Sequence, residues 1–228
     1  MRPGTLLRWV ALKNLLKSEI KDNSVILDIG GYDGEISYRL KNMLPKLNIT
    51  VVDIDKTGLK LAREKGLDTF YASALELPIK DNQVDVVLCL DLIEHVKEDN
   101  RLVKETSRVL RKDGKVILTT PMQNGVSFPF LSKERVEAIN KGWGHVRKGY
   151  SLESIKKLFE NNSLLIERKS SYFNLLTRLA YRFSVISKIP FKGESLLYRM
   201  VIKLEPYIRL GAQEHIIIGV KRSVMTYE

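Results

Sequence analysis

The sequence VILDIGGYDGE, residues 25–35, decides the fold of this chain of 228 residues. An apolar run that contains Asp28 is followed by two glycines and an Asp-Gly pair, a pattern that predicts a buried strand turning sharply into a helix. Glycines at such a turn let backbone N–H groups approach a ligand closely, and the start of the helix adds N–H groups without partners. The turn is therefore predicted to hold a ligand.

A second acidic residue supports a nucleoside ligand. Asp53 ends the apolar run NITVVD, 19 residues beyond Gly34, where a parallel neighbouring strand would deliver a carboxylate to a ribose diol. The dinucleotide pattern G-x-G-x-x-G is absent from GGYDG, residues 30–34, and Asp33 would put negative charge beside a phosphate. The pattern predicts a cofactor that is not anionic at this point and argues against a nicotinamide-dependent reductase.

The remaining chain alternates predicted strands and helices. Strands are expected at residues 48–53, 68–73, 84–90, 115–120, 164–168 and 215–222, and helices at 36–44, 56–66, 100–110 and 152–159, with turns at 77–83 and 112–114. This alternation predicts an α/β fold with a doubly wound, mainly parallel sheet.

Four motifs in order, LDIGGYDG, VVDID, ALELPIKDNQVDVVLCLDLIEHV and RVLRKDGKVILTTP, resemble those of the class I S-adenosylmethionine-dependent methyltransferases. The resemblance covers about residues 24–170 and is to the small-molecule and lipid-type branch, similar to quinone-type O-methyltransferases. It implies a seven-stranded sheet whose last strand is antiparallel, S-adenosylmethionine as cofactor, and O-methylation of a hydrophobic or lipid-linked acceptor.

The resemblance also implies a set of cofactor-binding residues, with two departures from the family pattern. Tyr32 stands where the family has its middle glycine, so the bend must be met by Gly31 or by a strained Tyr32. Ser73 stands where an acid commonly contacts the adenine, and this contact would use the Ser73 hydroxyl and the backbone of the next two residues. The predicted set is Asp28, Gly30, Gly31, Tyr32, Gly34, Asp53, Ile54, Ser73, Ala74, Leu75 and Leu90.

The segment DLIEHV, residues 91–96, carries the sharpest candidate for chemistry. If the chain turns helical after the fourth strand, Asp91, Glu94 and His95 share a face. His95 could then act as a general base oriented by Asp91 or Glu94. Resemblance to the quinone-type enzymes implies the alternative that these three residues hold a divalent ion, and a helix-capping role is the third. Of these alternatives, the site without a metal is the one we predict.

A second candidate catalytic histidine, His145, lies in WGHVRKGYS, residues 143–151. It is predicted to contact the acceptor or to transfer a proton, with a loop histidine of purely structural role as the alternative. Trp143 and Tyr150 could form walls of the acceptor pocket. His215, at the start of the last strand, is expected to be structural.

Length and composition fit one domain over residues 1–228, which the resemblance implies is a methyltransferase domain. The single cysteine, Cys89, lies in an apolar run and is predicted to be a core residue, consistent with a cytoplasmic protein. Residues 1–20 are predicted to form an amphipathic helix that packs on the domain or covers the cofactor pocket. Arg8, Lys13 and Lys17 interrupt the apolar residues of this segment, which argues against a signal peptide or a membrane span.

An insertion over residues 173–210 separates the last two strands. Two amphipathic helices are predicted in it, with the apolar stripes Leu175, Leu176, Leu179, Phe183, Ile186 and Leu197, Met200, Val201, Leu204, Ile208, separated by Pro190 and Gly193. It is predicted to cap the acceptor site and to touch an anionic membrane surface peripherally, or else only to pack on the sheet.

Charge supports an anionic partner. Residues 1–125 hold 20 basic and 18 acidic residues, and residues 126–228 hold 18 and 9, so the excess lies in the second half. An RNA-modifying methyltransferase ranks lower because no RNA-binding module accompanies the charge. A non-catalytic binding protein that keeps the fold is the other alternative. The oligomeric state does not follow from the sequence.

Overall fold

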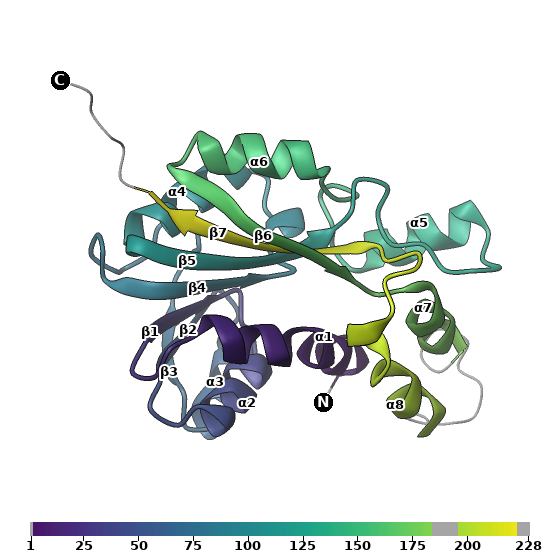
Figure 1. Cartoon of the computed structure of the whole chain (residues 1–228), viewed down its shortest axis with the longest axis horizontal. Coiled ribbons are helices and arrows are strands. Elements are labelled where there is room, and N and C mark those ends of the chain that lie inside the picture. Colours follow the sequence, from purple (N-terminus) through teal and green to yellow (C-terminus); the bar gives the residue numbers. More distant parts are fainter. Residues whose placement is uncertain (1, 184–195, 223–228) are drawn as a thin grey trace.

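The computed structural model describes residues 2–183 and 196–222. Its centre is a seven-stranded sheet in the order β3-β2-β1-β4-β5-β7-β6, which confirms the predicted α/β fold (Figure 1). The strands are β1 (Val25–Ile29), β2 (Asn48–Asp53), β3 (Asp68–Tyr71), β4 (Val84–Leu90), β5 (Leu110–Pro121), β6 (Leu164–Tyr172) and β7 (Glu214–Lys221). Strands β1 to β5 pair in parallel, and β7 pairs antiparallel with both β5 and β6.

Helices cover both faces of the sheet (Figure 1). Helices α1 (Pro3–Glu19), α2 (Glu35–Met43) and α3 (Lys56–Glu64) lie on one side, and α4 (Asp99–Val109) and α6 (Leu152–Glu160) lie on the other. The central strands β1, β4 and β5 are buried on both faces, because their apolar side chains belong to two separate core clusters. Cys89 is among these buried residues, as predicted.

Several predicted strand boundaries differ from those in the structure. β5 begins at Leu110, and the predicted turn at 112–114 is a bulge within that strand, where the left-handed Asp113 (φ 60°) shifts the pairing with β4. β3 ends at Tyr71, two residues early, and β6 continues to Tyr172 because β7 pairs with it along its full length.

The insertion contains α7 (Leu175–Tyr181), α8 (Leu196–Ile202) and a 3₁₀ turn (Glu205–Tyr207), which lie beside α1 in Figure 1, whereas α5 (Lys133–Gly142) lies farther along the same end. The predicted stripe on α7 is wrong: Leu175 and Leu176 are exposed, and Arg178 is buried because it donates to backbone carbonyls of Ser127 and Gly211. The prediction that the second stripe lies on one helix is also wrong, because α8 ends at Ile202, before Leu204. Ile186, Pro190 and Gly193 lie outside the described residues.

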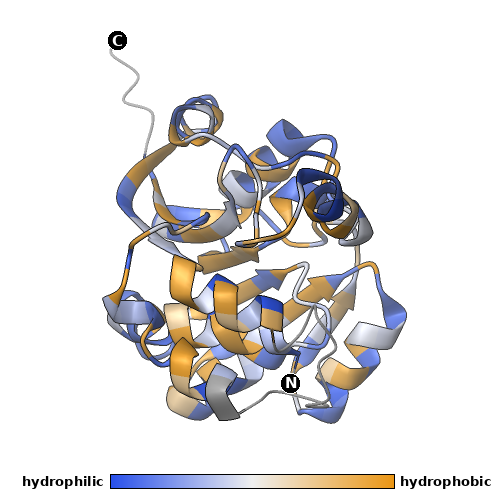
Figure 2. Cartoon of the chain, turned by 90° about the vertical axis from the view of Figure 1, so that its right-hand side faces the viewer, coloured by the Kyte–Doolittle hydropathy of each residue, from blue (hydrophilic) through white to orange (hydrophobic). Residues whose placement is uncertain are grey.

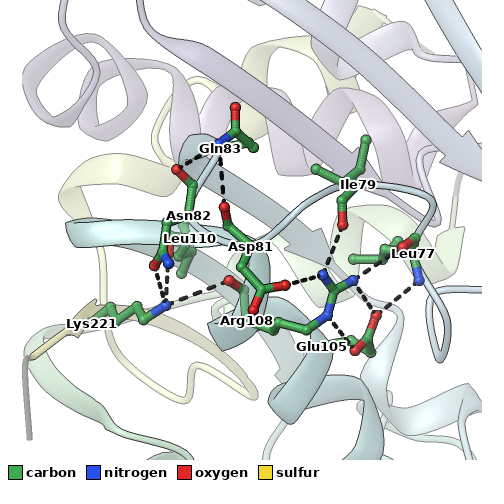
Figure 3. Close-up of polar contacts among 9 residues, drawn as sticks. All are labelled: Leu77, Ile79, Asp81, Asn82, Gln83, Glu105, Arg108, Leu110 and Lys221. Atoms are coloured by element: carbon green, nitrogen blue, oxygen red, sulfur yellow. Dashed lines mark hydrogen bonds and ion pairs between the residues drawn. The ribbon is translucent and has the colours of Figure 1, made fainter.

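Arg108 on α4 fixes the loop between β3 and β4 (Figure 3). Its guanidinium donates to the carbonyls of Leu77 (3.1 Å) and Ile79 (2.8 Å) and to the carboxylates of Asp81 (2.7 Å) and Glu105 (2.8 Å). On the other side of the loop, Lys221 of β7 donates to the side chain of Asn82 (2.9 Å) and to the Leu110 carbonyl. Arg108 and Lys221 therefore hold the loop that follows the predicted adenine contacts, and Arg108 makes most of the contacts.

We expect the substitution Arg108→Ala to lower the free energy of unfolding by about 2 kcal/mol, because it leaves the loop carbonyls and Glu105 without their charged donor. For a chain of this size the melting temperature should fall by roughly 5 °C in calorimetry. Arg63→Ala, which removes one exposed hydrogen bond to Thr69, is the matched control. Equal melting temperatures for the two variants would contradict this role.

Candidate functional site

The turn between β1 and α2 has three left-handed residues. Gly30 (φ 70°) and Gly34 (φ 62°) adopt this conformation readily, whereas Tyr32 (φ 50°) does so at a cost. The bend is therefore met by a strained Tyr32 and not by Gly31. Its N–H donates to the Asp53 carboxylate (2.8 Å), which couples the turn to the end of β2.

Asp53 supports the turn with both of its oxygens. Oδ2 accepts the Tyr32 N–H, and Oδ1 accepts the N–H of Asp55 (2.8 Å). Each carboxylate oxygen has two lone pairs, so each keeps one for a further donor. Asp53 can hold the turn and still accept hydrogen bonds from two ribose hydroxyls, as the sequence predicts.

Asp28 is buried under the same turn. Its Oδ2 accepts a hydrogen bond from the Ser37 hydroxyl (2.6 Å), and a Cβ at position 31 would lie 2.5 Å from this oxygen, so only glycine fits there. Burial raises the pKa of Asp28 to about 6, against the opposing effects of Ser37 and of the Arg8 charge. A cationic group over the turn would favour the ionised form.

We therefore expect the affinity for S-adenosylmethionine, whose amino-acid tail carries an ammonium group, to depend on pH. Binding should be strong above pH 6 and should weaken about tenfold as Asp28 takes up a proton between pH 7 and pH 5. In the free protein, stability depends on pH in the opposite direction to affinity. The contribution of Asp28 to the free energy of unfolding is largest below the ordinary pKa of an aspartate and is lost as the pH rises through 6.

Asp28→Asn tests both signs in one variant. Its affinity should be weak and nearly independent of pH, while its melting temperature at pH 7 should equal or exceed that of the wild type, because no buried charge has to form. Calorimetric titration and thermal unfolding at pH 5, 6 and 7 measure the two effects. A wild-type affinity that stays constant over this range would show that Asp28 does not contact a cation.

A cavity of about 400 Å³ opens between the turn and α1. Its lining includes the predicted residues Asp28, Gly30, Gly31, Tyr32, Leu90, His95 and His145, together with Gly4, Thr5, Leu7 and Arg8 of α1 and Arg2, which precedes this helix. The N-terminal helix thus both packs on the domain and covers the pocket. Gly34, Asp53, Ile54, Ser73, Ala74 and Leu75 are not in the lining. Ser73 is exposed, and its hydroxyl accepts the Leu75 N–H (3.1 Å).

Asp91 anchors α1 to the end of β4. Its carboxylate pairs with Arg8 and accepts hydrogen bonds from Thr119 and from the Tyr172 hydroxyl (3.2 Å). Asp91 itself is left-handed (φ 50°), so strain at the strand end is balanced by these contacts. The predicted grouping with Glu94 and His95 is wrong for Asp91, because its oxygens face Arg8 and Tyr172.

The segment after β4 forms a single 3₁₀ turn, Ile93–His95. This turn places Glu94 and His95 beside His145. Ligand atoms of Glu94, His95 and His145 all lie within 4.8 Å of one another, and the two imidazole rings meet edge to face with centroids 4.8 Å apart. A carboxylate and two imidazoles are ligand types that a divalent ion accepts. The candidate metal set therefore contains His145 in place of Asp91.

His95 is oriented by the backbone. Its Nδ1 donates to the Gly144 carbonyl (3.2 Å), which leaves Nε2 as the acceptor nitrogen. The prediction that Asp91 or Glu94 orients His95 is thus wrong. Burial, and then the charge of Asp91, raises the pKa of Glu94 to about 8. Burial and the neighbouring His95 lower the pKa of His145, so His145 is neutral at pH 7 and can accept a proton.

Aromatic side chains form the apolar wall of the pocket. Trp143, Phe173 and Tyr181 line it, and Phe128 packs behind all three, stacked on Tyr181 with centroids 5.9 Å apart. Tyr150 does not line the cavity as predicted. It is buried, and its hydroxyl donates to Asp99 (2.9 Å).

Among the pocket residues that the sequence does not predict are the polar side chains of Arg8, Tyr172 and Glu214. Arg8 lies on the N-terminal helix, which is predicted to cover the pocket without a named contact, and the other two lie at the end of β6 and the start of β7, where only strands are predicted. One signal was available, because His215 and the residue before it begin a strand at the same sheet edge as the candidate histidines. His215 itself contacts the Tyr150 carbonyl (3.1 Å) and is structural, as expected.

Comparison with known proteins identifies the family. A family described as a methyltransferase domain matches residues 27–118, which include the glycine turn, Asp53 and the segment after β4. Residues 27–118 are thus a methyltransferase domain. The match and the named relatives support S-adenosylmethionine as the cofactor of this methyltransferase domain.

Two curated relatives illustrate the match. A probable S-adenosylmethionine-dependent methyltransferase of Mycobacterium tuberculosis is 35% identical over 82 residues, 35% of this chain and 29% of that protein. The ubiquinone/menaquinone biosynthesis C-methyltransferase UbiE of Rickettsia massiliae is 33% identical over 107 residues, 42% and 43% of the two chains. The chain thus spans less than half the length of these relatives.

Solved structures share the fold over nearly the whole chain. The geranyl diphosphate C-methyltransferase of Streptomyces coelicolor A3(2), in complex with Mg²⁺, geranyl diphosphate and S-adenosyl-L-homocysteine, has a TM-score of 0.67 at 13% identity and covers 92% of this chain and 78% of its own. The [4+2]-cyclase SpnF has a TM-score of 0.67 at 16% identity, with coverages of 94% and 82%. A cyclase on the same fold shows that fold alone does not define the reaction.

Proposed function

We propose that this methyltransferase domain transfers the methyl group of S-adenosylmethionine to an oxygen of a hydrophobic small-molecule acceptor. The observation that carries the proposal is that the glycine turn, two imidazoles and three aromatic side chains line one cavity. Methyl transfer requires a nucleophile held in line with the sulfonium carbon and shielded from water. A pocket covered by α1 and walled by aromatic rings supports both requirements.

The imidazoles favour oxygen as the acceptor atom. A hydroxyl must lose its proton as it attacks, and Nε2 of His95 or the neutral His145 can take that proton. The rival is a ring carbon, because the UbiE relatives are named C-methyltransferases. A ring hydroxyl deprotonated by the same imidazole would also activate a neighbouring carbon, so the histidines alone do not separate the two products.

The pocket favours a neutral acceptor over an anionic one. Its lining holds the carboxyl groups of Asp28, Asp33, Glu35, Asp91, Glu94 and Glu214 but only the guanidinium groups of Arg2 and Arg8. An anionic acceptor would meet an excess of acids there. The same excess disfavours the RNA-modifying alternative, because a phosphate backbone needs basic contacts around the methylated position.

Transfer of tritium from methyl-labelled S-adenosylmethionine into a cell extract tests the reaction. We expect the label in the organic phase after partition between solvent and water. Hydriodic acid then cleaves O-methyl ethers to volatile methyl iodide and leaves C-methyl groups in place, which separates the two acceptor atoms. Label confined to RNA or to the aqueous phase would overturn the proposed acceptor class.

A neutral acceptor leaves the basic second half of the chain to another partner, and we assign it to an anionic membrane surface. The end of the molecule formed by α5, α7 and α8 mixes hydrophobic and hydrophilic residues, coloured orange and blue in Figure 2. Phe130, Tyr207 and Leu210 are at least 74% exposed. The Arg182 guanidinium lies over the rings of both Phe130 (5.7 Å) and Phe183 (5.1 Å).

Exposed aromatic and aliphatic side chains beside Arg and Lys favour the interface of an anionic bilayer. The membrane contact is peripheral in this proposal. Among the described residues, the structure contains no helix long and apolar enough to cross a bilayer.

Liposome flotation tests the contact. The intact protein should float with vesicles that contain anionic lipid and stay at the bottom with neutral ones, and the double variant Phe130→Ser, Leu210→Ser should lose about tenfold in the floated fraction. Phe70→Ser, an exposed aromatic position on β3, is the matched control and should float as the wild type does. Absence of wild-type flotation with anionic vesicles would end the membrane assignment.

A further inference from the structure

Glu214 is a buried acid in the pocket for which the mechanism above has no use. It begins β7, where its backbone pairs with Pro121 of β5 and Tyr172 of β6. The residue is only 6% exposed and lines the cavity, yet its Oε2 accepts no hydrogen bond from any residue in the described ranges. A buried carboxyl oxygen without a partner is costly, and native structures keep few of them.

Two further buried atoms in the same cavity lack partners among the described residues, Nε of Arg8 and Nδ1 of His145. The other three such atoms, on Asn140, Arg178 and Arg182, belong to residues outside the lining. Of the buried side-chain atoms without a partner in the described ranges, half therefore belong to residues that line one cavity. They offer one N–H donor, one carboxyl oxygen and one imidazole nitrogen, which is the polar surface of a binding site.

This polar surface lies across the cavity from the cofactor turn. The turn follows β1, and the sheet order β1-β4-β5-β7 puts two strands between it and Glu214. At about 4.8 Å per strand the separation is on the order of 14 Å, which is too far for Glu214 to contact the part of a cofactor that rests on the turn. Glu214 therefore faces the acceptor side, next to the aromatic wall of Phe173 and Tyr181.

We propose that Glu214 is the residue that determines acceptor specificity, by accepting a hydrogen bond from a hydroxyl group on an aromatic ring held between the wall and α1. A hydroxyl both donates and accepts, so it matches Oε2 of Glu214 as acceptor and Nε of Arg8 as donor. This inference rests on the proposed function, because it names the group that the acceptor presents to the same pocket.

The electrostatics of the pocket favour a neutral hydroxyl over a cationic amine. Burial first, and then the charges of Asp91 and Glu94, raise the pKa of Glu214 well above its usual range, while Arg8 opposes them. Titratable groups that face Glu214 come from α1 (Arg8), the end of β4 (Asp91), the 3₁₀ turn (Glu94) and β6 (Tyr172). Because burial favours the neutral form of Glu214 and Asp91 is already paired with Arg8, this side of the pocket has no free anion for an amine.

Equilibrium dialysis with two probes of equal shape tests the proposal. 2-Naphthol carries one ring hydroxyl and naphthalene carries none. In protein saturated with S-adenosylhomocysteine, we expect 2-naphthol to bind at least about tenfold more tightly than naphthalene. The near-isosteric variant Glu214→Met should reduce this ratio to about one, chiefly by weakening the binding of 2-naphthol.

The control variant is Glu167→Met, an acid on the outer strand β6 that pairs with Lys115 away from the cavity. It should keep the wild-type ratio. Glu214→Met should also keep the affinity for S-adenosylhomocysteine, which separates loss of specificity from loss of the fold. If Glu214→Met does not fold, Glu214→Ala carries the test with the same expected ratio.

Two results would overturn the proposal: a wild-type protein that binds the two probes equally, or a folded Glu214 variant that keeps the wild-type ratio. Failure of the wild type to bind S-adenosylhomocysteine would instead overturn the proposed function. Dialysis without that ligand would then still decide whether Glu214 recognises the hydroxyl.

Discussion

Replacing Asp53 with alanine is expected to weaken the binding of S-adenosylmethionine about 100-fold. The carboxylate has one free lone pair on each oxygen for the two ribose hydroxyls, and hydrogen bonds to a charged group contribute about 1.5–3 kcal/mol each. The substitution also removes the acceptor of the Tyr32 N–H, so the left-handed turn loses the contact that holds it. Both effects lower affinity, and calorimetric titration measures their sum.

Asp85→Ala is the matched control for this prediction. Asp85 also accepts a backbone N–H from the neighbouring strand, that of Val25 (2.8 Å), but it lies at the opposite end of the sheet. Its loss should lower stability and leave the affinity for S-adenosylmethionine within about threefold of the wild type. An Asp53→Ala protein that binds as tightly as the wild type would show that the ribose lies elsewhere.

His95→Ala is expected to lower the turnover number of methyl transfer about 100-fold, with little change in cofactor affinity. Removal of a general base costs this much when the acceptor hydroxyl must lose its proton in the transition state. The Gly144 carbonyl fixes the ring through Nδ1, so Nε2 is the nitrogen that takes the proton. The initial rate of label transfer into solvent-extractable product is the measurement.

The third histidine provides the control. His215 contacts the Tyr150 carbonyl and does not line the cavity, so His215→Ala should keep turnover within about threefold. Chelation separates base from metal: a general base works in excess EDTA, whereas a metal held by Glu94, His95 and His145 would be removed and turnover would fall. Near-normal turnover of His95→Ala would exclude the base role.

The parts of this site that are local in sequence are predictable. Residues 25–35 define the strand, the turn and the start of α2 by themselves, because glycine spacing and apolar runs act over a few residues. Asp53 follows from the same local logic, since a parallel strand ends where its neighbour does. All seven strands are predicted, and the errors are at their ends, where pairing with a neighbouring strand decides the boundary.

The parts that depend on distant segments were not predictable. Arg8 meets Asp91 across 83 positions of sequence, and Glu214 reaches the pocket only because β7 inserts between β5 and β6. The apolar stripe on α7 was misread because Arg178 finds buried carbonyl partners, which outweigh helical periodicity. The partner of His95 is the backbone carbonyl of Gly144. Because every residue has a carbonyl, the sequence does not indicate which one accepts a hydrogen bond from the histidine.

In our proposal, the turn at residues 30–34 and Asp53 hold S-adenosylmethionine, and α1 closes the acceptor side of the cavity beside this turn. A crystal structure with bound S-adenosylhomocysteine tests it most directly. We predict both ribose hydroxyls at the Asp53 carboxylate, the amino-acid tail over the turn beside Asp28, and the sulfur directed toward His95 and His145. A ligand bound elsewhere, or a sulfur directed away from these imidazoles, would contradict the claim.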